Sequence, residues 1–138
     1  MQNFLSNFAE VRKLTVDGTA DATHGVDMAN HDGVMFLVLS GSASLTVQAQ
    51  QAASLSNSLL SEADDIGAVI PATAIGSGDT ILVDIYRPTG RYVGLEFSDA
   101  DHVTAVWALK YHASVKPVDN STPDDLLLKQ LISPEVVV

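Results

Sequence analysis

The chain has 138 residues, of which 17% are charged and 46% are hydrophobic, and its formal net charge is −10. It contains no cysteine, which excludes a disulfide scaffold and any zinc or iron–sulfur site held by thiolates. The length fits one domain, the mean hydropathy of +0.20 argues against intrinsic disorder, and the acidic balance argues against a nucleic-acid partner.

The N-terminal residues 1–8 contain neither a basic segment nor an apolar stretch, so they do not predict a secretory signal. The longest apolar run, residues 34–39, is far shorter than the ~20 residues that span a bilayer. We therefore expect a protein that is made in the cytoplasm and has no membrane partner.

Short apolar segments separated by turn residues predict an all-β chain. The first strand is predicted at residues 11–16, before the turn Asp17-Gly18, and a weaker one at residues 24–28. Residues 34–39 are apolar on both faces. This pattern predicts a central strand, covered on one side by a second sheet and on the other by the tails or by a partner.

Strict alternation over residues 45–50 predicts a half-buried antiparallel strand with a polar outer face. Residues 50–65 are rich in Gln, Ala and Ser and show no clear period, so we expect a long loop with a helical turn at residues 59–63. A further short strand is expected at residues 66–70, ending before Pro71.

Two alternating segments, residues 81–86 and 91–97, flank a predicted turn at residues 87–90. Pro88 suits the first central position of such a turn, and Gly90 can adopt a positive φ. The pattern therefore predicts a β-hairpin.

The last strand is expected at residues 103–112. One of its faces is predicted to point into the core and carries Val103, Ala105, Trp107, Leu109 and Tyr111. Val106 and Ala108 make the opposite face partly apolar as well.

The C-terminal residues 117–138 form a Pro-containing tail. Thr122 as N-cap, Pro123 at the first helical position and the carboxylates that follow predict a short helix there. We thus expect an N-terminal arm at residues 1–10 and one antiparallel jelly-roll or β-sandwich domain of about seven or eight strands at residues 11–116.

Patterns typical of enzymes and metal sites are absent from the sequence. The four histidines lack the spacing of a zinc motif, and no acidic cluster follows the calcium-loop pattern. Weak calcium binding by Asp99 and Asp101 is conceivable, but a solvated turn explains them better. We predict no catalytic residue, no metal and no cofactor.

Arg87 and Arg91 flank the predicted turn and admit two interpretations. They could present a paired guanidinium patch to an acidic partner. Local ion pairs with Asp84, Glu96 or Asp79 are the favoured alternative.

Both ends of the chain carry apolar residues that a sandwich does not need, and such segments often mark interfaces. The predicted interface residues are Phe4, Leu5, Phe8, Leu131, Ile132, Val136, Val137 and Val138. The alternative is that both tails lie back on their own domain.

One block of the sequence is distinctive and has the pattern Y-R-P-x-x-R-Y-V. It comprises Tyr86, Arg87, Pro88, Thr89, Gly90, Arg91, Tyr92 and Val93. An apolar strand ending Lys110-Tyr111 follows it, and the tail ends in the motif S-P-E at residues 133–135. In these features the chain resembles the capsid cement (decoration) proteins of tailed bacteriophages, a group that includes jelly-roll cement proteins of podophages.

The resemblance implies a non-enzymatic virion protein that clamps neighbouring subunits of the major capsid protein from the outer capsid surface. Arg87, Pro88, Gly90, Arg91 and Tyr92 match the family as fold-defining positions. A charge of −10 suits the face of a shell away from packaged DNA. We expect homo-oligomers, with a homodimer favoured over a trimer.

A carbohydrate-binding jelly-roll module of a phage tail or receptor-binding particle is the alternative function. Its sugar-stacking residues would be drawn from Trp107, Tyr86, Tyr92 and Tyr111.

Overall fold

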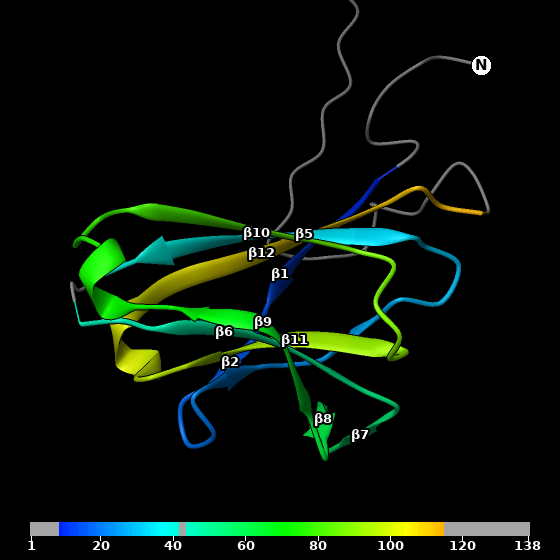
Figure 1. Ribbon diagram of the computed structural model, residues 1–138, viewed down its shortest axis with the longest axis horizontal. Coiled ribbons are helices and arrows are strands. Elements are labelled where there is room, and N and C mark those ends of the chain that lie inside the picture. Colours follow the sequence, from blue (N-terminus) through cyan, green and yellow to red (C-terminus); the bar gives the residue numbers. More distant parts are fainter. Residues whose placement is uncertain (1–8, 42–43, 115–138) are drawn as a thin grey trace, which may run out of the picture.

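Antiparallel strands dominate the computed structural model, which describes residues 9–41 and 44–114 (Figure 1). The four-stranded sheet runs in the order β1 (Glu10–Leu14), β12 (Val103–Tyr111), β5 (Gly33–Ser40) and β10 (Thr80–Tyr86). The six-stranded sheet runs in the order β2 (Val16–Asp17), β3 (Ala22–Thr23), β11 (Tyr92–Phe97), β6 (Val47–Ala52) and β9 (Asp64–Ile70), with β4 (Val26–Asp27) paired to β11. The all-β, sandwich-like prediction is confirmed.

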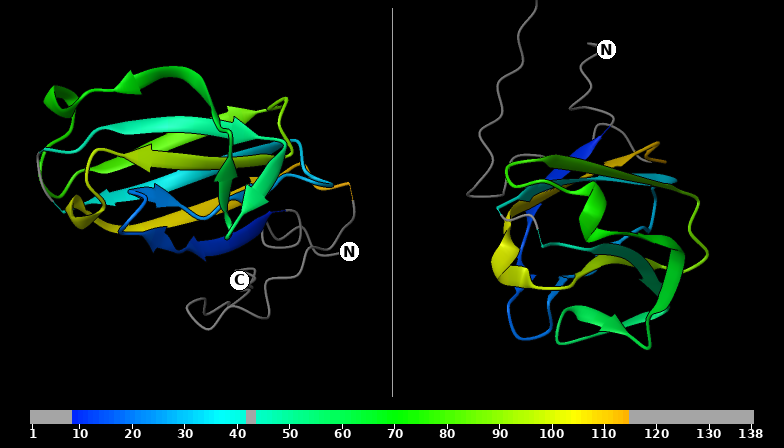
Figure 2. Two further views of the ribbon diagram at one scale, coloured as in Figure 1. Left: turned by 90° about the horizontal axis from the view of Figure 1, so that it is seen from below. Right: turned by 60° about the vertical axis from the view of Figure 1, so that its left-hand side comes forward.

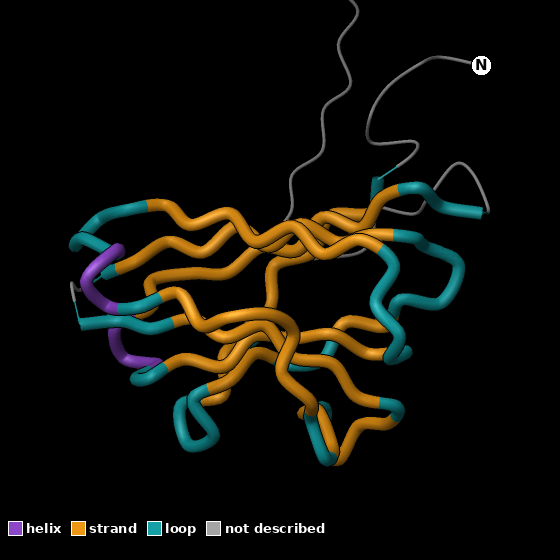
Figure 3. The backbone as a smooth tube through the Cα atoms, viewed as in Figure 1, coloured by secondary structure: helices purple, strands orange, loops and turns teal. Residues whose placement is uncertain are grey.

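The two sheets pack face to face, as the layers of Figure 2 show. Short 3-10 turns, η2 (Ala72–Ala74) and η3 (Ala100–His102), lie at one end of the sandwich (Figure 3). No helix in the described part of the chain is long and apolar enough to cross a membrane.

The core lies between the sheets and follows the alternation of the strands. Val34, Phe36 and Val38 of β5 are fully buried and share one apolar cluster with Val93 and Leu95 of β11. β5 is a central strand between β12 and β10, and the second sheet covers this face, as predicted. Burying such side chains contributes about 1.5–3 kcal/mol each.

The predicted hairpin at residues 81–97 is wrong. β10 pairs with β5, whereas β11 pairs with β6, so residues 87–91 carry the chain from one sheet to the other. Alternation reports correctly which side chains face inward, but it does not identify the neighbouring strand. The positive φ of 52° falls on Arg87 rather than on Gly90.

The predicted long loop at residues 50–65 is also wrong. This stretch contains the end of β6, a hairpin of β7 (Ser54–Ser56) and β8 (Leu59–Ser61), and the start of β9. The hairpin turn places Asn57 and Ser58 at φ values of 51° and 66°, the type I′ arrangement that matches strand twist. The sequence lacks the usual Asn-Gly signal here, which explains the error.

The predicted core face of the last strand is inverted. Val106 and Ala108 of β12 are 0% and 2% exposed, whereas Trp107 and Leu109 point to the other side of the sheet. The pairing of β12 with β5 shifts register between Val103 and Ala105, which marks a bulge. One extra residue reverses the parity of every side chain that follows.

The N-terminal strand prediction needs a smaller correction. Residues 11–16 divide into β1 and β2, which belong to different sheets, and the weaker strand contracts to β4. Of the arm predicted at residues 1–10, residues 1–8 lie outside the described residues and Glu10 already belongs to β1. The tail at residues 117–138 and its helix also lie outside the described residues.

Candidate functional site

The face of the four-stranded sheet that points away from the core is apolar, and we call it the outer face. Cross-strand pairing aligns Trp107, Leu37 and Leu82 in one row across β12, β5 and β10. Leu109 and Met35 form the next row. Leu82 is 58% exposed, and Lys13 and Asp84 are the charged residues that the described strands place on this face.

Aromatic side chains gather at one end of the outer face, which we call the aromatic end (Tyr86, Arg87, Tyr111 and His112). The rings of Tyr86 and Tyr111 are nearly parallel, with centroids 6.4 Å apart and an interplanar angle of 7°. His112 meets both rings edge-on. The Arg87 guanidinium lies 5.2 Å from the centre of the Tyr86 ring, and Tyr86 is 52% exposed.

The position of the Tyr111 side chain depends on a carboxylate that binds its hydroxyl and on a glycine that leaves room for its ring. Its hydroxyl donates a 2.5 Å hydrogen bond to Oδ1 of Asp84 on β10. Burial, followed by this hydrogen bond, raises the pKa of Tyr111 to about 12. A β carbon at Gly33 would overlap the Tyr111 ring, so glycine at this position lets the ring cross β5.

Arg87 and Arg91 line one open hollow of about 400 Å³, together with His31 and Asp32. Arg91 pairs with Asp27 through Nη2–Oδ2 and Nε–Oδ1 distances of 3.0 and 3.2 Å. This hydrogen-bonded pair lowers the pKa of Asp27 and raises that of Arg91.

The favoured prediction of local pairing with Asp84, Glu96 or Asp79 is therefore wrong for Arg91, because its partner is Asp27 on β4. No local sequence pattern indicates this partner, since 64 positions separate the two residues. Arg87 instead stacks on Tyr86.

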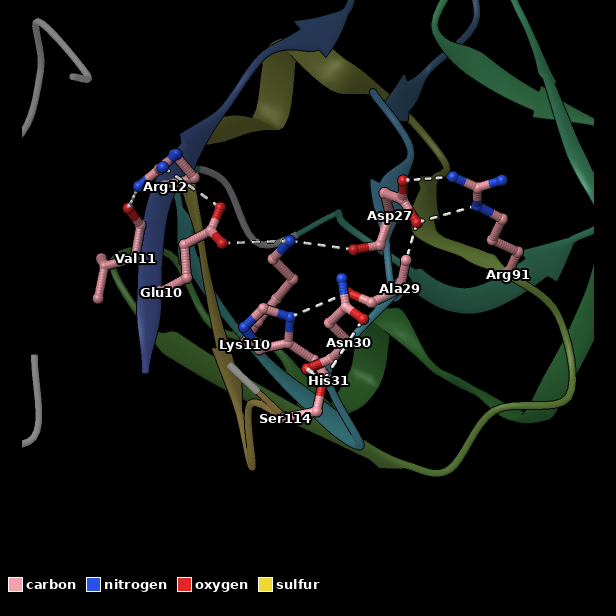
Figure 4. A network of polar contacts seen from close by, with 10 residues as sticks. All are labelled: Glu10, Val11, Arg12, Asp27, Ala29, Asn30, His31, Arg91, Lys110 and Ser114. Atoms are coloured by element: carbon pink, nitrogen blue, oxygen red, sulfur yellow. Dashed lines mark hydrogen bonds and ion pairs between the residues drawn. The ribbon is translucent and has the colours of Figure 1, made fainter. Parts of the chain in front are cut away.

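A polar network ties the two sheets together beside this hollow (Figure 4). Nζ of Lys110 on β12 donates to the backbone oxygen of Asp27 at 3.0 Å and lies 3.5 Å from Oε2 of Glu10. Arg12 contacts the other oxygen of Glu10 at 3.3 Å. The Lys110 side chain is only 13% exposed, and its ammonium group is compensated by Glu10 and by the backbone oxygen of Asp27.

The remaining predicted site residues are distributed as follows. Tyr92 lies under the Arg91 guanidinium, 5.1 Å from it and apart from the Tyr86–Tyr111 pair. Pro88 lines the hollow, and Gly90 donates its N–H to Oε1 of Gln51. The predicted apolar interface residues of the two tails lie outside the described residues.

The described residues include no group of three or more acidic or histidine side chains that could hold a metal ion. Asp99 caps η3 by accepting from the N–H of Asp101, in keeping with the predicted turn. The two-sided apolar pattern of residues 34–39 predicts a covered outer face, but Leu37, Leu82 and His112 are not among the predicted site residues.

Comparison of the chain with models of known protein families, with curated proteins and with solved structures found no match.

Proposed function

We propose that the protein decorates a bacteriophage capsid and clamps neighbouring subunits of the major capsid protein from outside. The observation that carries this proposal is the outer face, with its row of Trp107, Leu37 and Leu82. The resemblance of the Tyr86–Tyr92 block to capsid cement proteins suggests the partner.

The composition of this surface suits protein binding. Interfaces have apolar centres and polar rims, and tyrosine, tryptophan and arginine supply most of their strongest contacts. Here an apolar centre adjoins Tyr86 and Arg87, and the stacking of the two limits the freedom that Arg87 would lose on binding.

The charge of −10 supports an outer location, because a strongly acidic protein is repelled by packaged DNA. In this proposal the protein is made in the host cytoplasm, joins the virion surface, and needs neither a cofactor nor catalysis. Many copies on one lattice would compensate for modest affinity at each contact.

We also propose that the sandwich is a jelly roll. Its sheet orders are β1-β12-β5-β10 and β2-β3-β11-β6-β9. The chain therefore passes from one sheet to the other between β5 and β6, β9 and β10, β10 and β11, and β11 and β12. Residues 87–91 form the crossing from β10 to β11, so the structural role of the Tyr86–Tyr92 block is to connect the two sheets.

The test is binding to purified shells that lack the protein, measured by cosedimentation and by the temperature at which the shells break. Wild type should bind and raise that temperature. Tyr86→Ser should weaken binding by roughly 30-fold, the effect expected for a hot-spot side chain worth ~2 kcal/mol. Val69→Ser is the matched control, because Val69 is an exposed apolar residue on β9 of the other sheet.

Two results would contradict the proposal. One is the absence of any bound protein on the shells together with unchanged heat resistance. The other is equal loss of binding by the Tyr86 and Val69 variants, because the outer face would then have no special role.

A carbohydrate-binding function is the second candidate, favoured by the parallel rings of Tyr86 and Tyr111 beside the Asp84 carboxylate. Aromatic faces can stack on sugar rings while a carboxylate accepts from hydroxyls. A glycan array, run with and without calcium, tests it: signal that disappears in Tyr86→Ser supports this function, and a blank array removes it.

A further inference from the structure

Edge strands expose unpaired backbone groups, and proteins usually protect them. In the described part of the chain, the strand orders of the four-stranded and six-stranded sheets end in four edge strands, and three of these are protected. β1 carries Glu10, Arg12 and Lys13, and β2 has only two residues. β9 begins with two aspartates, contains Gly67 at a φ of 67°, and pairs irregularly with β6.

The β10 edge has only one of these protections, a single charged residue. Its seven residues, Thr80–Tyr86, pair with β5 in unbroken register, and its other edge pairs with no strand in the described ranges. The strand contains no proline and no basic residue, and Asp84 is its single charge. A regular, open strand of this kind is a template for pairing with another strand.

The hydrogen bonds that flank β10 identify which of its backbone groups are free. Ser40 N donates to Asp79 O, and Arg87 N donates to Asp32 O, so positions 79 and 87 point toward β5. Antiparallel pairing alternates along a strand. The N–H and C=O groups of Thr80, Leu82, Asp84 and Tyr86 therefore point to the open edge.

We propose that the β10 edge pairs antiparallel with the β10 edge of a second copy of this chain, about a two-fold axis at Leu82. This register places Leu82 opposite Leu82 of the partner and Asp84 opposite Thr80, whose hydroxyl can donate to the carboxylate. Thr80, Leu82 and Asp84 all direct their backbone groups to the open edge. The 82–82 pair and the two 80–84 pairs therefore exchange hydrogen bonds, and the 81–83 pairs between them do not. A register centred on Asp84 would oppose two carboxylates and is disfavoured.

The pairing joins two four-stranded sheets into one continuous sheet. Since opposed residues of paired strands share a face, both outer faces lie on the same side of the dimer. If the proposed function holds, the dimer therefore presents a doubled apolar surface to one shell. The pairing itself is independent of capsid binding.

The absence of cysteine allows a direct test with single-cysteine variants of the full chain. Leu82→Cys should form a disulfide-linked dimer under mild oxidation, because opposed residues of this kind have Cα atoms about 5.5 Å apart. Val69→Cys is the matched control, an exposed apolar position on the β9 edge. The Leu82 variant should cross-link more than about tenfold faster, because pairing raises the effective thiol concentration to the millimolar range.

Light scattering on wild type provides the second measurement, with an expected mass of twice 14.6 kDa. Leu82→Lys, which opposes two positive charges at the axis, should shift that mass to the monomer while the circular dichroism spectrum is unchanged. A monomeric wild type overturns the proposal, as does a dimer in which the Leu82 and Val69 variants cross-link equally. Failure to bind shells would leave the cross-linking result unaffected, so the two proposals fail separately.

Discussion

Replacing Gly90 with alanine tests whether residues 87–91 cross between the sheets. A β carbon at Gly90 would lie 3.0 Å from both the backbone N and the backbone O of Ala52 on β6. Carbon contacts are optimal at about 3.5–4.0 Å, so β6 must move to admit the methyl group. The obstruction is backbone, which cannot rotate away as a flexible side chain can.

The expected cost follows from two opposing terms. Overpacking typically destabilises by about 1–3 kcal/mol, and removing a glycine stabilises by about 0.4–1 kcal/mol through the unfolded chain. We therefore expect Gly90→Ala to lower the free energy of unfolding by about 1–2 kcal/mol. Urea unfolding followed by the fluorescence of Trp107, the single tryptophan, measures it.

Two further variants make the result decisive. Gly18→Ala is the control, because a β carbon there meets nothing within 4 Å, and we expect unchanged or slightly increased stability. Gly90→Asn separates crowding from turn geometry, since asparagine tolerates a positive φ that Gly90 does not adopt. Full stability in Gly90→Asn, or equal stability of Gly90→Ala and Gly18→Ala, would refute the steric explanation.

Three further predictions concern the inverted strand β12 and the shifted pKa values of Tyr111 and Asp27. Val106→Thr, at a fully buried site, should lower the free energy of urea unfolding by about 1–3 kcal/mol, and Val11→Thr on the outer face should lower it less. The reverse order would contradict the inward orientation of Val106 that follows from the β12 bulge. In a spectrophotometric titration one tyrosine should ionise near pH 12, and this transition should be absent from Tyr111→Phe. The contribution of Tyr111 to stability is complete below pH 10 and is lost as the pH rises toward about 12. Asp27→Asn should be less stable than wild type at neutral pH, because Arg91 lowers the Asp27 pKa. The difference in unfolding free energy should disappear as the pH falls below 3.8 and Asp27 is protonated. A difference that does not change with pH would contradict an ionic cause.

The sequence predicts the inward-facing residues well where one strand follows an undisturbed alternation. Val93, Leu95 and Phe97 of β11 are buried as expected. Prediction fails where a single residue changes parity, as at the β12 bulge, since alternation contains no signal for an insertion that reverses it.

The candidate site was only partly predictable for a different reason. The two-sided apolar pattern of β5 indicated that its outer face needs a cover, and this face became the proposed docking surface. The Tyr86–Tyr111 stacking and the Tyr111–Asp84 hydrogen bond depend on strand order, which brings β10 and β12 to opposite sides of β5. No local pattern reports such an order.

The most direct test of capsid decoration is electron cryomicroscopy of shells incubated with the protein. The account predicts added density on the outer surface, with the outer face of the four-stranded sheet turned toward the major capsid protein and Tyr86 at the contact. Shells without added density, or density in which the six-stranded sheet contacts the shell, would contradict it.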